Sequence, residues 1–357
     1  MTRRPAATST GNPDHVVVVG SGSAGRRHVA AFRAALPATR ITVVRRSDSN
    51  QPTEVLTRAG ADTTDTVAEA VADGVDIGVV AGPAPLHEGA ATELLAAGAD
   101  LLVEKPLTDQ PGSAARLVAR AAAAQRSLVV GYHLRVGDTV PALRRAIEAG
   151  AIGTPTSFDL QVGQHLSAWR AGTDPASSVS ARADLGGGVL LELSHELDGL
   201  RYLLGDVLDV DAVLGHGGAP TDGVVETVAD LRLHTAGGAA GTVHLDMVSD
   251  PPRRTWRIGG ADGDLVADLL TGRISALDTR TDRTRELQGP VDPGERDRAE
   301  TRLVANVVEV HAGRSLPVCT GADGVAALEI VAAARRSAAS GRAEPVTSAT
   351  STVAGLS

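Results

Sequence analysis

The sequence predicts an α/β protein with two domains: a doubly wound parallel sheet, followed by a domain built on a mostly antiparallel open sheet. Three observations lead to this fold class. Four valines, Val16–Val19, run directly into a glycine-rich turn. Strand-like and helix-like segments then alternate as far as Gly131, which is typical of a parallel sheet. From Val207 onward, several strand-like segments follow one another without helices between them, which is typical of an antiparallel sheet.

The first element is the segment Val16–Gly25, which reads V-V-V-V-G-S-G-S-A-G. The valine run suits a strand buried on both faces, and residues 26–36 suit a helix. G-x-G-x-x-G between a strand and a helix favours dinucleotide binding: its glycines permit a tight turn, close approach of a diphosphate, and packing of helix on strand. The following helix N-terminus would offer N–H groups to the phosphates. The alternative is a glycine-rich turn in another kind of α/β protein. The residues expected at the cofactor here are Gly20, Gly22, Ser23, Ala24 and Gly25.

The second strand is expected at Arg40–Val44, and Arg45 and Arg46 follow it. NAD-binding folds place an acidic residue near this position to hold the ribose 2′-hydroxyl, whereas arginine accommodates a 2′-phosphate. Two arginines therefore favour NADP, with NAD as the alternative cofactor and a solvated strand end as the structural alternative.

The rest of the first domain repeats the strand–helix alternation. Strands are expected at 76–81, 100–103 and 128–131, and helices at 65–73, 88–97 and 110–124. The strand at 76–81 ends in a loop with two prolines, and ligands of open parallel sheets bind beyond such strand ends. We place this domain at residues 15–133 and the substrate-binding and oligomerisation domain at 134–342, with loose tails at 1–14 and 343–357.

In the second domain the pattern changes. Helices are expected at 141–149, 189–204, 299–312 and 324–340, and strands at 155–162, 207–214, 224–234, 239–248, 254–258 and 264–269. An open sheet that is covered on one face by helices needs a cover on its other face.

The composition excludes several classes of function. A formal net charge of −9 argues against nucleic acid and against an anionic membrane surface as partners. No apolar run reaches the ~20 residues of a membrane span. The single cysteine, Cys319, cannot form an internal disulfide, which is consistent with a reducing cytoplasm. The histidines show no metal-ligand spacing, and we expect no metal.

From about Val16 to Arg342, the chain resembles the glucose–fructose oxidoreductase / inositol dehydrogenase / MocA family. The motifs that carry the resemblance are G-S-G-S-A-G-R-R-H at 20–28, P-A-P-L-H at 83–87, V-E-K-P-L at 103–107, G-Y-H-L-R at 131–135, W-R at 169–170 and G-G-G-V-L-L-E-L-S-H-E-L-D at 186–198. The resemblance implies a Rossmann domain, a C-terminal α/β domain that often forms a dimer face, and hydride transfer between a nicotinamide and a sugar-like substrate. It further implies a homodimer or homotetramer.

Within that pattern, Lys105 matches the family's catalytic lysine and His195 its catalytic histidine. Lys105 would act as a proton donor or as a fixed charge that polarises a carbonyl. The alternatives are a surface lysine and a core histidine. The family places an aspartate four residues before the histidine, where this chain has Leu191. Glu192, three residues before, would share a helix face with His195 and orient it, and Asp198 competes for that role.

Other motif residues are expected near the cofactor, each with a structural alternative. His87 either contacts the ribose or caps a helix, His133 and Arg135 line the cleft or pack a hinge, and Trp169 with Arg170 meets a phosphate or braces a loop. Gly186–Gly188 either lets the backbone approach the substrate or cofactor closely, or is a flexible segment that leads into the following helix. The cofactor set implied by the resemblance adds Pro83, His87, Glu104, Arg135, Trp169 and Arg170 to the glycine loop and the two arginines.

Three functions remain open at this point. The first is an NAD(P)-dependent dehydrogenase or reductase acting on a sugar, cyclitol or nucleotide-sugar-like alcohol or ketone. The second is a glycoside hydrolase of the same fold that uses bound NAD in a transient oxidation. The third is a non-catalytic dinucleotide sensor, against which intact Lys105 and His195 argue.

Overall fold

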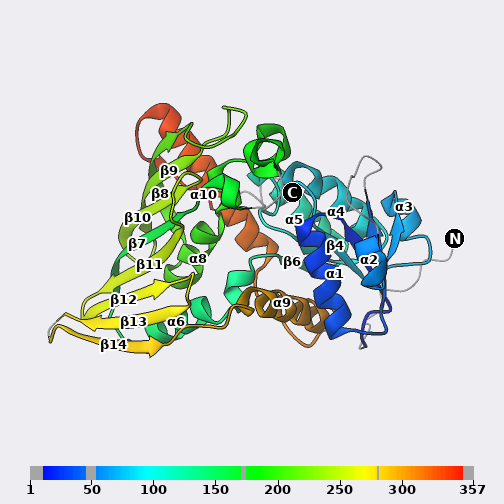
Figure 1. Cartoon of the computed structure of the whole chain (residues 1–357), viewed down its shortest axis with the longest axis horizontal. Helices are drawn as coiled ribbons and strands as arrows, with labels where there is room; N and C mark the ends of the chain where they lie inside the picture. The colour runs from blue at the N-terminus through cyan, green and yellow to red at the C-terminus, as the bar shows by residue number, and fades with distance from the viewer. Residues whose placement is uncertain (1–10, 46–53, 170–173, 280, 349–357) are drawn as a thin grey trace.

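The computed structural model describes residues 11–45, 54–169, 174–279 and 281–348 of the 357-residue chain. Two lobes, each built around one sheet, lie side by side, with α9 (Glu295–His311) and α10 (Gly321–Ser340) between them (Figure 1). Within the described ranges, no helix is long and apolar enough to cross a membrane.

The first lobe is a parallel sheet with the strand order β3-β2-β1-β4-β5-β6. Its strands are β1 (His15–Val19), β2 (Arg40–Val44), β3 (Asp62–Thr64), β4 (Ile77–Val80), β5 (Asp100–Val103) and β6 (Leu128–Val130). Its helices are α1 (Ser23–Ala35), α2 (Glu54–Arg58), α3 (Val67–Ala70), α4 (His87–Ala96) and α5 (Pro111–Ala123). The chain reverses its direction of winding between β1 and β4, and ligands bind beyond the carboxyl ends of strands at such a point.

Alternation along β1 gives this sheet two cores. Val16 and Val18 point to the core that contains α1, whereas Val17 points to the core under α4 and α5. The first core also contains Leu303, Val304 and Val307 of α9. A helix from the C-terminal part of the chain therefore covers a face of the N-terminal sheet, and α9 lies beside α1 in Figure 1.

The second lobe has a sheet with the order β14-β13-β12-β11-β7-β10-β9-β8-β15, antiparallel except where β7 meets β10. Its strands are β7 (Pro155–Gly163), β8 (Val207–Gly215), β9 (Val228–Thr235), β10 (Ala240–Asp246), β11 (Arg253–Gly260), β12 (Gly263–Asp268), β13 (Arg273–Asp278), β14 (Arg283–Gln288) and β15 (Glu344–Pro345). The helices α6 (Thr139–Glu148), α7 (Val189–Glu192) and α8 (His195–Leu204) pack with it. The expected fold class, a parallel sheet followed by a mostly antiparallel one, is confirmed.

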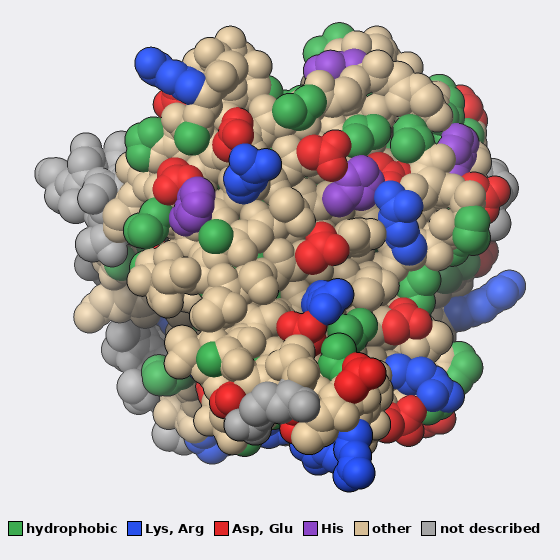
Figure 2. All heavy atoms as spheres, turned by 90° about the vertical axis from the view of Figure 1, so that its left-hand side faces the viewer, with side chains coloured by type: hydrophobic (Ala, Val, Ile, Leu, Met, Phe, Trp, Pro, Cys, Tyr) green, Lys and Arg blue, Asp and Glu red, His purple; other side chains and the backbone are tan. Residues whose placement is uncertain are grey.

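The inner face of this sheet is apolar and is covered by helices. Trp256 of β11 is fully buried against α8, and a Cβ on Gly199 would lie 2.1 Å from its ring. The outer face is polar, with ion pairs such as His234–Asp209 and His244–Asp230. Figure 2 views the molecule from this side and shows acidic, basic and histidine side chains dispersed among apolar ones.

The structure departs from the expected helix at 189–204. The helix is broken at Leu193–Ser194, so α8 begins at His195. The Ser194 hydroxyl donates to the Leu191 carbonyl oxygen at 2.9 Å and accepts from the Tyr132 hydroxyl at 3.2 Å. A serine that binds nearby main-chain groups in this way competes with helix continuation. The expectation that Glu192 and His195 share one helix face was therefore wrong.

Short and polar edge elements were not expected. The strands β3 and β14 lie at sheet edges, and the residues of β14 are mostly exposed. Neither has the apolar pattern by which strands are identified. The segment after Ala343, expected as a tail, includes β15, which pairs with β8.

Candidate active site

The glycine turn is built so that one glycine faces open space. Gly20 has a φ of +118°, and a Cβ on it would lie 2.8 Å from the Ala81 carbonyl oxygen. A Cβ on Gly25 would lie 1.9 Å from the carbonyl oxygen of Gly20, whereas nothing lies within 4 Å of a Cβ on Gly22. α1 begins at Ser23, with Ala24 in its first turn and no acidic residue there. This cradle fits a diphosphate, which needs close approach to the backbone and the free N–H groups of a helix N-terminus.

The position expected for the ribose lies at the end of β2. Arg45 follows that strand directly, beside β1, and its main-chain N–H donates to the Thr64 carbonyl oxygen at 2.9 Å. Its side chain is half-buried. Arg46 lies outside the described residues.

His87 joins two loops at the carboxyl edge of the sheet. Pro83 precedes a short 3-10 helix (Ala84–Leu86), and His87 follows it as the first residue of α4. The buried ring places Nε2 2.9 Å from the Gly82 carbonyl oxygen and Nδ1 3.1 Å from that of Pro106. Burial lowers the pKa of His87. Its ring thus holds the Pro83 loop against the loop that carries Lys105.

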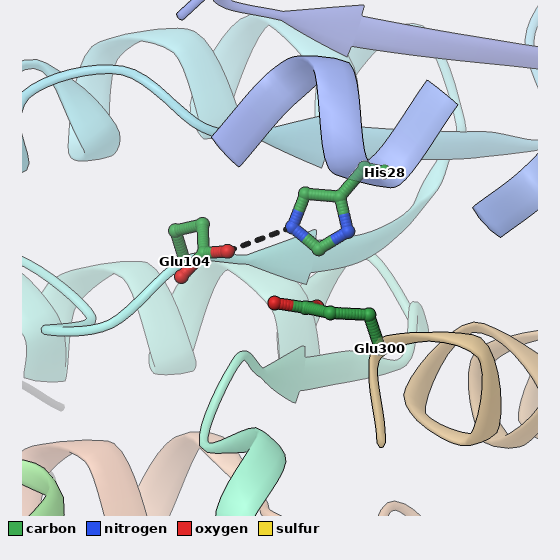
Figure 3. A group of neighbouring side chains, drawn as sticks. All are labelled: His28, Glu104 and Glu300. Atoms are coloured by element: carbon green, nitrogen blue, oxygen red, sulfur yellow. Dashed lines mark hydrogen bonds and ion pairs between the residues drawn. The ribbon is translucent and has the colours of Figure 1, made fainter. Parts of the chain in front are cut away.

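Glu104 anchors the strand end from which Lys105 projects. Its Oε1 accepts from His28 Nε2 at 2.8 Å (Figure 3). Its Oε2 accepts from the Lys105 main-chain N–H at 3.1 Å. Burial alone would raise the pKa of Glu104, but the hydrogen bond and charge of His28 outweigh it and hold that pKa at about 2. Burial would lower the pKa of His28, but Glu104 outweighs it and raises that pKa. Glu104 therefore contacts the glycine-loop helix and the lysine loop together.

Glu300 of α9 completes a buried cluster with His28 and Glu104, and the three candidate ligand atoms lie within 4.8 Å of one another (Figure 3). Burial raises the pKa of Glu300. This spacing would allow a metal ion. However, the Glu104–His28 bond already occupies two of the ligand atoms, and the Arg27 and Arg296 charges beside Glu300 oppose a cation. We therefore interpret the cluster as a charge network that joins α1, β5 and α9.

Lys105 reaches across to the second lobe. Its Nζ donates to the main-chain carbonyl oxygen of Glu192 at 2.7 Å. It is also the only lysine in the sequence, which uses arginine at every other strongly basic position. The structure thus brings the end of β5 to the segment that leads into His195.

His195 is buried at the start of α8. Its ring meets the ring of His133 edge-on, with centroids 4.6 Å apart, and that of Tyr132 at 5.4 Å. Burial, reinforced by His133, Lys105 and two arginines, holds the pKa of His195 well below its ordinary value. The ring is therefore in its neutral form at pH 7. Its Nδ1 has no hydrogen-bond partner among the described residues.

The two carboxylates expected to orient His195 have other partners. Glu192 accepts from the Ser180 hydroxyl at 2.9 Å. Asp198 accepts from the Arg135 guanidinium at 2.7 and 2.9 Å, and this pair is buried. Arg135, expected near the cofactor, is thereby committed to joining the start of the second lobe to α8.

The tryptophan motif and the triple glycine lie in loops of the second lobe. Trp169 Nε1 donates to the Gln164 carbonyl oxygen at 2.9 Å, which braces its loop, and Arg170 lies outside the described residues. A Cβ on Gly187 would lie 2.6 Å from the Val179 carbonyl oxygen, so this glycine allows two loop segments to pack together.

Comparison with known proteins identifies the family. One family model, described as oxidoreductase family with an NAD-binding Rossmann fold, matches residues 15–132, and the GFO/IDH/MocA C-terminal domain matches 140–266. Inositol 2-dehydrogenase 1 of Saccharopolyspora erythraea is 31% identical over 287 residues, which cover 72% of this chain and 80% of that protein. The chain belongs to the Gfo/Idh/MocA oxidoreductase family.

Other Gfo/Idh/MocA members are similar over comparable lengths. The 1,5-anhydro-D-fructose reductase of Ensifer adhaerens is 28% identical over 269 residues, covering 73% of this chain and 77% of that protein. A levoglucosan dehydrogenase in complex with NADH and levoglucosan has a TM-score of 0.80 at 21% identity, covering 94% of this chain and 99% of that one. This structural likeness shows the shared fold. The expected oxidoreductase family with an NAD-binding domain is confirmed.

Several residues of this Gfo/Idh/MocA site were missed by sequence reasoning. They are His28, Glu300, Arg254 and Arg296, which come from α1, α9, β11 and α9. The sequence offered one signal, His28 three residues after the last motif glycine, on the buried side of α1. The other three lie more than 50 residues from His195 in the sequence, and only the packing of the lobes brings them to the site.

Proposed function

We propose that this protein transfers a hydride between the nicotinamide of a bound dinucleotide and a carbon that bears a hydroxyl or keto group, on a sugar, cyclitol or nucleotide-sugar-like substrate. The observation that carries the proposal is the convergence of Lys105 and His195, from different lobes, on one another. Lys105 Nζ, from the first lobe, donates at 2.7 Å to the main-chain carbonyl oxygen of Glu192, three residues before His195 in the second lobe. The relatives named above act on compounds of this kind, by their names.

In this proposal, the nicotinamide supplies or accepts the hydride, and the protein manages the proton. Lys105 and His195 would face the substrate oxygen from the two lobes. The neutral imidazole of His195 would accept a proton when the alcohol is oxidised, and Lys105 would polarise the oxygen. His87 and Glu104, which hold the loop of Lys105, would position it.

The proposed cofactor is NADP, with NAD as the alternative. Support comes from Arg45, which directly follows β2, and from Arg46 after it, since this strand end is where such folds hold the ribose. The other cofactor-facing residues proposed are the glycine loop, Pro83 and, in the second lobe, Trp169 and Arg170.

A homodimer or homotetramer is proposed from the outer face of the second sheet. Helices cover the inner face of that sheet, whereas on its outer face Val213 is 70% exposed. The buried, unpaired Cys319 further favours a cytoplasmic location.

The experiment is a screen of NADPH and NADH oxidation, followed by absorbance, across keto-sugars, inososes and keto nucleotide sugars. The proposal expects turnover with at least one class and none in Lys105→Met. If the protein binds cofactor but turns over no class of substrate, and Lys105→Met does not change cofactor binding, a dinucleotide sensor would be favoured instead.

A further inference from the structure

Arg254 of β11 points to the inside of the second lobe, on the same strand face as Trp256. Its Nε donates to Glu196 Oε1 at 2.7 Å, next to His195 in the sequence. Its Nη2 is buried and has no hydrogen-bond partner among the described residues, and neither has Glu196 Oε2. An arginine beside a carboxylate usually pairs through two parallel bonds. The Nη2 of Arg254 is therefore a buried donor that is available to a bound ligand.

Arg296 lies in the first turn of α9, four residues before Glu300 and so on the same face of the helix. It makes no hydrogen bond and no close ion pair within the described part of the chain. Arg296 is exposed, and partial desolvation of its guanidinium together with the neighbouring charge of Arg27 lowers its pKa. This arginine is thus held near other cations without a carboxylate in contact.

Both arginines act on the two histidines at the centre of the site. Burial and the Arg296 charge, with a contribution from Arg254, lower the pKa of His133 to about 3. The same two arginines lower the pKa of His195. The nearby carboxylates are engaged: Glu104 with His28, Glu300 with Arg27 at 3.4 Å, and Glu196 with Arg254. Lys105 and Arg296 therefore bring positive charge to His195, and no carboxylate of the described residues forms an ion pair with either of them.

A site with this charge is stabilised by an anion, because guanidinium groups bind carboxylate and phosphate through charge-assisted hydrogen bonds. The diphosphate of the cofactor already has the cradle at Gly22 and the N-terminus of α1. Arg254, in contrast, projects from the other lobe and lies beside the His195 segment. An anion bound at Arg254 would therefore belong to the substrate.

We propose that Arg254 and Arg296 form an oxyanion subsite, so that the substrate is a polyhydroxylated compound carrying a carboxylate or a phosphate. This proposal rests on the function proposed above for Lys105 and His195. The reacting carbon would lie at these two residues, and the oxyanion would lie between the two guanidinium groups, which suit carboxylate and phosphate equally.

The test measures equilibrium binding by calorimetry to the enzyme saturated with reduced cofactor, which cannot oxidise the probes. The probes are D-glucose, D-glucuronate and D-glucose 6-phosphate, which differ only in the charged group. We expect at least one charged probe to bind about tenfold more tightly than glucose, the effect of one charge-assisted hydrogen bond. The charged probe that binds more tightly identifies the carboxylate or the phosphate as the anion.

The variants are Arg296→Gln and Arg254→Lys. Arg296→Gln removes a group without a close partner, so the fold is expected to remain intact, and Arg254→Lys keeps a charge for the buried Glu196. Both substitutions should weaken binding of the charged probe about tenfold and leave the affinity for glucose unchanged. The control is Arg257→Gln, on the outer face of the same strand and paired with Asp264, which should change neither.

Equal binding of charged and neutral probes, or no binding of either charged probe, would overturn the proposal. So would a loss of cofactor affinity in Arg296→Gln with charged-probe affinity retained, which would assign that arginine to the dinucleotide. Because binding is measured without turnover, an enzyme that binds the anion but oxidises nothing would refute the proposed function and leave the subsite standing.

Discussion

The Nζ of Lys105 lies 2.7 Å from the main-chain carbonyl oxygen of Glu192, so the lysine of one lobe touches the segment that carries His195 in the other. The contact is with the backbone, and the Glu192 carboxylate is turned toward Ser180. The position of Lys105 thus depends on the fold of residues 189–195 more than on the identity of side chain 192.

Lys105→Met should lower turnover by about 10²–10⁴-fold, because a positioned proton-transfer or polarising group is lost. Cofactor affinity should change little, since the glycine cradle is separate. Glu192→Gln keeps the main-chain carbonyl and should have a smaller effect. Steady-state kinetics with the active substrate and a cofactor titration check this, and near-normal turnover in Lys105→Met would remove the central claim.

Because Lys105 is the only lysine, an amine-directed acylating reagent has two targets, this side chain and the N-terminal amine. Activity should fall in proportion to acylation at Lys105, measured by peptide mass spectrometry. Labelling of the N-terminal amine alone should leave activity intact. Full activity in protein acylated at Lys105 would contradict the proposed role.

Replacing Arg45 with Asp and Arg46 with Ser should shift the cofactor preference from NADP toward NAD. A 2′-phosphate loses charge-assisted hydrogen bonds, each worth about 1.5–3 kcal/mol, and an acidic side chain suits a 2′-hydroxyl. Fluorescence titration with NADPH and NADH measures both affinities. Equal affinity of the unaltered protein for the two cofactors would refute the assignment.

The buried histidines predict a loss of stability in mild acid. His133 has a pKa of about 3, because burial and Arg296 disfavour its charged form, and the unfolded chain binds that proton near pH 6.5. The free energy of unfolding should therefore fall as pH drops below 6.5, by about 1.4 kcal/mol per unit for each such histidine. Denaturant unfolding measured between pH 7 and 5 should show that the free energy of unfolding depends less steeply on pH in His133→Gln than in the unaltered protein. An unchanged slope would contradict this environment for His133.

The second sheet predicts an oligomer. Its outer face has no helix packed on it among the described elements, and light scattering at micromolar concentration should give a dimer or tetramer mass. Val213→Asp, on the outer side of β8, should weaken the assembly if that face is the interface. A monomer mass for the unaltered protein would refute the prediction.

The sequence alone determined the features that depend on neighbouring residues. The valine run and the glycine spacing predicted the parallel sheet and the cradle, because strand burial, tight turns and helix starts are local. The family resemblance carried by the E-K-P motif indicated Lys105. Edge strands such as β14 were not predicted, since an exposed strand needs no apolar pattern.

Only the tertiary structure decided the charge environment of the site. Hydrogen bonds from Ser194 to Leu191 and from Tyr132 broke the expected helix, which separated Glu192 from His195. Packing of α9 on the first sheet brought Glu300 to His28 and Glu104, and β11 brought Arg254 beside Glu196. The spacing of residues along the chain cannot predict these contacts. They arise because apolar faces of elements far apart in the sequence are buried against one another, and this packing then fixes where the charges lie.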